Sequence, residues 1–188
     1  SAFLTQDLLK AAQPEQRGRD TPIGALLDEA AAKLQDRFKD EPLVACRLYQ
    51  TIASAYHELG DYAFARKQLE AAIERLDEAG ALDEETSAAR GILQEELVNT
   101  IVLEGRYDDA LQLATRISSE VERLLGARSE QAAQLRQAIG DAQLGLQHYE
   151  LAETAFRELL ELREKAWGPQ TRETGVALGS LARCIRLR

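Results

Sequence analysis

The chain has 188 residues, of which 45% are hydrophobic but only 5% aromatic, and it contains 4 prolines. This composition favours helix, and without alternating segments rich in Val, Ile and Thr the sequence predicts no sheet. The formal net charge of -9 excludes a general binder of the nucleic-acid backbone, which needs clustered Lys and Arg.

The first 20 residues predict an amphipathic helix over Phe3 to Ala12, followed by a polar linker. Thr21 and Pro22 then form a helix start, because a capping hydroxyl precedes a proline at the first helical position. We expect a helix over residues 21–39.

Residues 42–80 predict a helical hairpin, since apolar side chains recur at three and four positions on both sides of Gly60 and Asp61. Glycine tolerates a positive φ, and aspartate can cap the helix that follows. Where two helices cross closely the contact needs small side chains, and we expect Ala53, Ala65 and Ala72 to lie there.

Two further hairpins are predicted over residues 83–126 and 129–167, with Asp83 and Ser129 as caps. A final helix over residues 171–188, capped by Thr171, has no partner helix after it. Its inward residues are predicted to be Val176, Leu178, Leu181, Ala182 and Ile185.

The hairpins are copies of one unit. Tyr62, Tyr107 and Tyr149 recur at intervals of 45 (107 − 62) and 42 (149 − 107), and an alanine lies three residues after each tyrosine. Such a period predicts an all-α solenoid over residues 21–188, in which neighbouring hairpins stack because none can bury both its faces alone.

The segment from Gly60 to Ala72, with its Gly-Asp-Tyr turn, Ala65 and Leu69, resembles the tetratricopeptide repeat. The long period is similar to the variety found in kinesin light chains and many bacterial signalling proteins. This resemblance implies a right-handed α-α superhelix that binds extended peptides or partner helices along its concave side.

The segment from Ala2 to Tyr62 resembles the part of bacterial transmembrane signalling proteins that joins a membrane span to a tetratricopeptide array. In those proteins the amino-terminal head is a Ser/Thr protein kinase or a winged-helix transcriptional regulator. The resemblance implies a sensing or interaction module, periplasmic rather than cytoplasmic, which meets the membrane only through its parent protein.

No catalytic, cofactor or metal motif is found in the sequence. His57 and His148 are interpreted as surface residues, and Cys46 and Cys184 as small core residues. We therefore expect no enzymatic activity, no cofactor and no metal in this chain; a kinase domain would belong to the parent protein.

The candidate binding residues are the outward positions of the first helix in each hairpin. They are Arg47, Gln50, Thr51, Ser54, His57 and Glu58, then Glu95, Glu96 and Asn99, then Gln134, Gln137 and Asp141, and finally Arg183 and Arg186. The family's clamp for a terminal carboxylate needs Lys and Asn where this chain has Gln50 and Ser54. We therefore do not predict binding of chaperone tails.

The acidity of the chain is concentrated between Leu69 and Glu130, which contain 15 acidic and 6 basic residues. We interpret this as a solvated surface, and the alternative is a docking surface for a basic partner. The function predicted is binding of a protein or peptide, without nucleic acid. The alternative is a self-assembly module, a homodimer that oligomerises the parent kinase or transcriptional regulator, and a small-molecule enzyme or sensor would need a closed apolar cavity.

Overall fold

The computed structural model describes residues 23–38, 40–80 and 83–188, and these contain helices and no strand. The helices are α2 (Ile23–Arg37), α3 (Pro42–Glu58), α4 (Tyr62–Ala79), α5 (Glu84–Leu103), α6 (Tyr107–Leu125), α7 (Glu130–Gly145), α8 (Tyr149–Trp167) and α9 (Arg172–Leu187). The predicted all-α fold class is confirmed. The helix expected over Phe3 to Ala12 and the start at Thr21 and Pro22 lie outside the described residues.

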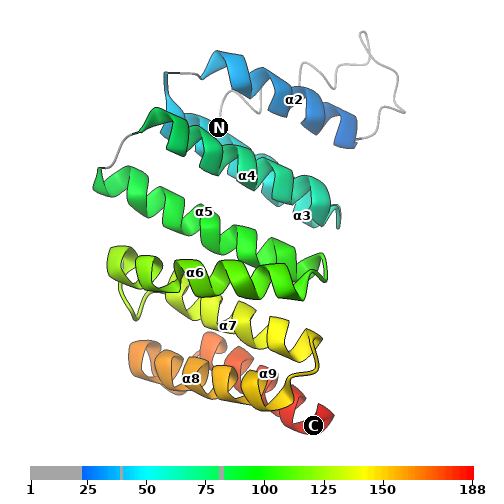
Figure 1. Ribbon diagram of the computed structural model, residues 1–188, viewed down its shortest axis with the longest axis vertical. Helices are drawn as coiled ribbons and strands as arrows, with labels where there is room; N and C mark the ends of the chain where they lie inside the picture. Colours follow the sequence, from blue (N-terminus) through cyan, green and yellow to red (C-terminus); the bar gives the residue numbers. More distant parts are fainter. Residues whose placement is uncertain (1–22, 39, 81–82) are drawn as a thin grey trace. The chain divides into compact units, whose positions relative to one another are not determined.

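The chain divides into two compact units, Ser1–Leu82 and Asp83–Arg188. In the first unit α3 and α4 form a hairpin, and α2 packs on α3. In the second unit α5 pairs with α6 and α7 with α8, while α6 also packs on α7 and α8 on α9 (Figure 1). Each unit therefore shows the predicted hairpins, whereas the single array over residues 21–188 stays a prediction.

The turns between paired helices all use one left-handed residue. Gly60 and Gly105 have φ values of 73° and 76°, and Gln147, at the same place in the third hairpin, has a φ of 63°. A left-handed conformation costs a residue other than glycine about 1–2 kcal/mol. The third hairpin keeps the turn of the other two in spite of this cost.

Side-chain caps begin three of the helices of the second unit. Asp83, Ser129 and Thr171 each accept a hydrogen bond from the backbone N–H three residues later, at 2.7, 3.2 and 3.2 Å. These bonds satisfy amides that have no partner inside the helix. The three predicted caps are thereby confirmed.

The core of the first unit lies between α3 and α4. Ala53, Ala65 and Ala72 are buried, as predicted for small residues at a close crossing. α3 also packs on α2, in which Leu27, Ala30 and Leu34 are buried, and the hydroxyl of buried Tyr56 donates to Asp28 Oδ1 on α2 at 2.6 Å. This partly buried hydrogen bond joins α2 to α3.

The core of the second unit includes a cluster in which α8 lies between α7 and α9. The buried residues of this cluster are Ala133 and Leu144 of α7, Ala152, Phe156 and Leu159 of α8, and Ala177, Leu181 and Cys184 of α9.

This cluster corrects the predicted orientation of α9. Of the five residues expected to face inward only Leu181 is buried, whereas Val176, Leu178, Ala182 and Ile185 are exposed. The buried side instead follows Ala177, Leu181 and Cys184, at intervals of four and three. The error arose because α9 has apolar residues on two sides, and its sequence does not say which side meets α8.

Gly140 of α7 permits a close approach of α8. A Cβ atom at this position would lie 2.4 Å from Cε1 of Phe156, a fully buried ring. We expect Gly140→Ala to lower the free energy of unfolding by about 2 kcal/mol, because overpacking outweighs the roughly 1 kcal/mol that alanine gains over glycine in a helix. Urea unfolding followed by circular dichroism measures the change.

The matched control for this substitution is Gly179→Ala on α9, where a Cβ would meet nothing within 4 Å. This variant should gain about 0.5–1 kcal/mol from helix propensity alone. Equal stability of the two variants would show that α8 does not approach Gly140 so closely.

Candidate functional site

The candidate residues of the first unit lie along α3. Arg47, Thr51, Ser54 and Glu58 are exposed, and Gln50 and His57 are half-buried. The hydroxyls of Thr51 and Ser54 donate to carbonyls one turn earlier in the same helix, at 2.8 and 3.0 Å. The His57 ring lies edge-on to Tyr62, and burial lowers the pKa of His57.

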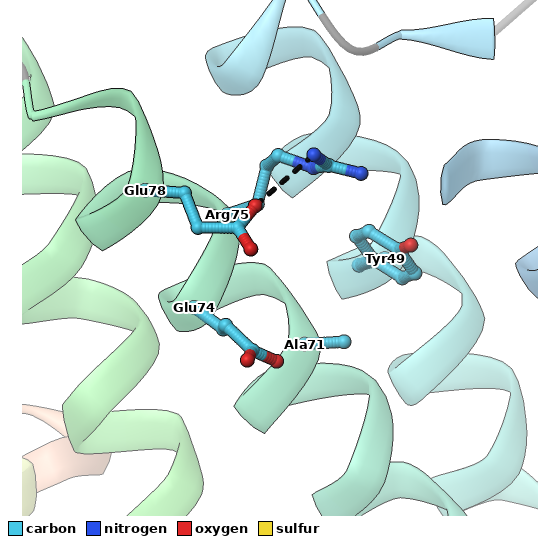
Figure 2. A pocket seen from close by; sticks show the side chains of 5 residues that line it. All are labelled: Tyr49, Ala71, Glu74, Arg75 and Glu78. Carbon is cyan, nitrogen blue, oxygen red and sulfur yellow. Dashed lines mark hydrogen bonds and ion pairs between the residues drawn. The ribbon is translucent and has the colours of Figure 1, made fainter. Parts of the chain in front are cut away.

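A polar pocket of about 300 Å³ opens on the first unit beside α3 and α4. Figure 2 shows its lining residues, Tyr49, Ala71, Glu74, Arg75 and Glu78. The pocket's arginine is paired within α4, since Arg75 Nη1 lies 3.2 Å from Glu78 Oε2. None of these residues was predicted from the sequence as part of a site.

The second unit brings several of its candidate residues together on the first helices of successive hairpins. α5 packs on α7, and a hydrogen bond and an ion pair join α7 to α9. The polar residues on these three helices, named here the α5–α7–α9 face, are Glu95, Glu96 and Asn99 of α5, Gln134, Gln137 and Asp141 of α7, and Ser180 and Arg183 of α9. The remaining candidate, Arg186, is exposed on α9.

Gln137 joins α7 to α9. Its Nε2 donates to Asp141 Oδ2 at 2.8 Å and to Ser180 Oγ at 3.1 Å. Asp141 also forms an ion pair with Arg183 of α9, with 3.5 Å between Oδ1 and Nη2. These contacts place the polar sides of the two helices next to each other.

An amide–carboxylate pair occurs at the same place on α5 and α7. On α5 the Asn99 side chain donates to Glu95, and on α7 the Gln137 side chain donates to Asp141, both across one helical turn. The two pairs are 42 residues apart (137 − 95 and 141 − 99), the interval that separates Tyr107 from Tyr149. The repeat therefore keeps the pair but reverses the order of amide and acid.

Glu95 departs from its prediction as a solvent-facing residue, because only 6% of it is exposed. Burial raises the pKa of its carboxyl to about 8, and the negative charges of Glu96 and Glu130 act in the same direction. Within the described ranges Glu95 has no ion pair, and its hydrogen-bond partner is Asn99. The spacing of polar and apolar residues within this one helix did not predict that Glu95 is buried.

Asp141 has a different environment. Burial raises the pKa of its carboxyl, while the hydrogen bond from Gln137 and the charge of Arg183 lower it. The carboxylate on α7 is thus partly neutralised by Arg183 of α9, whereas the carboxylate on α5 has no cation beside it among the described residues.

Arg163 of α8 connects α7 to α9 beneath the face and was not predicted from the sequence. It is only 3% exposed, and it donates to the Glu173 carbonyl at 2.9 Å and to Glu130 Oε1 at 3.3 Å. Gln134 donates to the same Glu130 oxygen at 2.8 Å. The partners of Arg163 lie 10 and 33 residues away, so no local pattern indicated them.

The remaining reactive side chains belong to the core. Cys46 and Cys184 are buried free thiols, and burial raises the pKa of Cys46 to about 11, which keeps it in the unreactive thiol form. Across residues 23–38, 40–80 and 83–188 no three His, Cys, Asp or Glu side chains are grouped to hold a metal. No helix in these ranges is long and apolar enough to span a bilayer.

Comparison with known families gives a match to the model of the tetratricopeptide repeat at residues 47–75 and 133–165. These two segments are tetratricopeptide repeats. They lie in the α3–α4 and α7–α8 hairpins, the two in which the Gly60 turn and the Gly140–Phe156 contact occur. Tetratricopeptide repeats generally mediate protein–protein interactions, and proteins built from them are typically not catalytic.

Solved tetratricopeptide structures of the kinesin-light-chain type have the same fold. BtubC (BKLC) from P. vanneervenii is 16% identical, with a TM-score of 0.68 over 86% of this chain and 64% of its own. A point variant of a kinesin-light-chain-type protein of Podosopora anserina with nearly identical TPR-like repeats is 17% identical, with a TM-score of 0.70 over 98% of this chain and 85% of its own. A second structure from that organism is also 17% identical, with a TM-score of 0.67 over 98% of this chain and 86% of its own.

These values confirm the predicted resemblance to the long-period variety of the repeat at the level of the fold. The chain spans just under two thirds of the length of BtubC.

Proposed function

We propose that the chain is an interaction module that binds a peptide or a helix of a protein partner on the α5–α7–α9 face. The observation that supports this function is the row of polar side chains that three successive first helices bring together. Gln137 hydrogen-bonds across two of these helices, and its Oε1 is buried without a hydrogen-bond partner among the residues described. Glu96, Gln134 and Arg183 on this face are partly or fully exposed, so they can hydrogen-bond a guest.

We infer a second contact surface on the first unit, formed by the exposed residues of α3. Its members are Arg47, Thr51, Ser54 and Glu58, with the half-buried Gln50 and His57 beside them. The row is polar and of mixed charge, so it suits a polar peptide better than an apolar helix.

We further propose that the module belongs to a bacterial transmembrane signalling protein, a Ser/Thr kinase or a transcriptional regulator, and lies in the periplasm. The support is the resemblance of the segment from Ala2 to Tyr62 to the membrane-proximal part of such proteins. Fusing alkaline phosphatase after the module in the parent protein should give active enzyme. An inactive phosphatase fusion, with a fluorescent GFP fusion at the same site, would contradict the periplasmic location.

The binding face is tested with peptides that are selected from a random library for binding to the whole chain. Replacing Gln134 and Arg183 together by alanine should lower the affinity for the selected peptides at least about tenfold, because each side chain contributes about 1 kcal/mol when it hydrogen-bonds a ligand. Fluorescence anisotropy of labelled peptides measures the affinity.

A matched double variant on α6, Gln112→Ala with Arg116→Ala, removes the same side-chain types from an exposed surface. It should leave the affinity within a factor of about two. Melting curves should show both double variants folded at the assay temperature, because the Arg183 side chain is 55% exposed, although that of its partner Asp141 is only 28% exposed. Peptides that lose affinity equally in both variants, or in neither, would place binding elsewhere.

A second candidate function is self-assembly, which is favoured by the outer side of α9. Val176, Leu178, Ile185 and Leu187 are each about half exposed on this helix, an unusual density of exposed apolar residues. Sedimentation from micromolar to near-millimolar concentration separates this function from the first. A strict monomer throughout that range would exclude assembly through α9.

A further inference from the structure

The α5–α7–α9 face contains one buried carboxylate that the described chain does not neutralise. Glu95 is as buried as a core residue, and the charged groups that act on it, Glu96 and Glu130, are both acidic. Its hydrogen bond comes from a neutral amide, that of Asn99. A buried carboxylate is tolerated as an ion only when a cation or several donors compensate it.

The neighbouring repeat shows what Glu95 lacks. The corresponding pair on α7, Gln137 and Asp141, receives a cation from the next first helix in the form of Arg183. The residue of α7 that corresponds to Arg183 is Asp141 itself (183 − 141 = 42). The repeat position that holds a cation on α9 therefore holds an acid on α7.

The side-chain amide donors on this part of the face are already engaged. Gln134 donates to Glu130, and Gln137 donates to Asp141 and Ser180, while Gln137 Oε1 is left buried with no donor in the described part of the chain. Around Glu95 the face thus has acceptors and negative charge in excess, and the described residues supply no cation to this carboxylate.

We propose that the partner bound on this face inserts a lysine or arginine side chain against Glu95, an inference that rests on the proposed function. An ammonium or guanidinium group carries only donors and a positive charge, so it matches both deficits. The acidic side chains of Glu96 and Glu130, which act on Glu95, favour a basic partner over an acidic one.

The experiment uses peptides selected on the whole chain from a random library at about pH 9, where Glu95 is ionised and lysine is still charged. The selected peptides should share one basic position. Replacing that residue by methionine should weaken binding to the parent at least about tenfold and binding to Glu95→Gln less than about twofold. Glutamine keeps the shape of Glu95 and an oxygen that can accept from Asn99, so the variant removes the charge alone.

The control Glu164→Gln removes the same charge from an exposed position of α8, and it should respond to the methionine peptide as the parent does. This inference would be overturned if the selected peptides shared no basic position. It would also be overturned if the methionine replacement lowered the affinity for the parent and for Glu95→Gln equally. Neither result would contradict the binding face. If the methionine replacement weakened binding to Glu164→Gln as little as it weakened binding to Glu95→Gln, the effect would come from the net charge of the chain. That result would also overturn the inference. Peptides insensitive to the Gln134 and Arg183 double variant would overturn the binding face itself.

Discussion

Replacing Ala65 by arginine should lower the free energy of unfolding by at least about 4 kcal/mol. Ala65 is 0% exposed on α4, which packs on α3, and the small residues Ala53 and Ala72 of the two helices are also buried. Overpacking such a contact costs about 1–3 kcal/mol, and a buried cation without a partner costs several more. Urea unfolding followed by circular dichroism would show the loss, or show that the first unit no longer folds.

Ala63→Arg is the control for this variant, because Ala63 is exposed two residues earlier on the same helix. Arginine is a good helix former, so this substitution should change stability by less than about 0.5 kcal/mol. If Ala65→Arg unfolded at the same urea concentration as Ala63→Arg, the crossing of α3 and α4 would be wrongly placed.

Glu95→Gln should stabilise the protein in alkaline solution by up to about 4 kcal/mol and have little effect below about pH 4.5. The pKa of Glu95 rises from its ordinary value of 4.5 to about 8 on folding. Between these values the folded protein retains a proton that the unfolded chain has released. The stability of the parent therefore falls as the pH rises through this window, and the favourable contribution is gone above the folded pKa.

Unfolding free energies measured between about pH 5 and pH 9 test this slope. Glutamine is neutral throughout this range, so the variant should lack the pH dependence of stability that Glu95 causes. The pKa of Asp141 is also raised, and its contribution to the pH dependence should be the same in both proteins. Glu164→Gln, at an exposed site, should keep the slope of the parent. Parallel curves for the parent and Glu95→Gln would mean that Glu95 is ionised and solvated in the folded protein.

A residue that destabilises the fold at neutral pH calls for a reason other than packing. Proteins commonly retain such groups where binding uses them, at the expense of stability. The two effects of Glu95→Gln, greater stability in alkali and weaker binding of a basic peptide, are therefore expected together.

The sequence by itself determined the local architecture. Helix positions followed from apolar spacing, from the caps Asp83, Ser129 and Thr171, and from the turn at Gly60, because all of these act within one or two helical turns. The recurrence of one tyrosine and one alanine in each hairpin was sufficient to predict the repeat. The small residues Ala53, Ala65 and Ala72 were predicted correctly as buried for the same reason.

Only the tertiary structure decided which side of a helix is covered. The side of α9 that meets α8, the burial of Glu95 and the partners of Gln137 and Arg163 all depend on packing against other helices, which the pattern of one helix does not contain. A helix with polar or apolar residues on more than one side is compatible with several neighbours, and its own periodicity does not choose among them. The charge balance of the α5–α7–α9 face is set by that choice, because it depends on which cation each carboxylate meets.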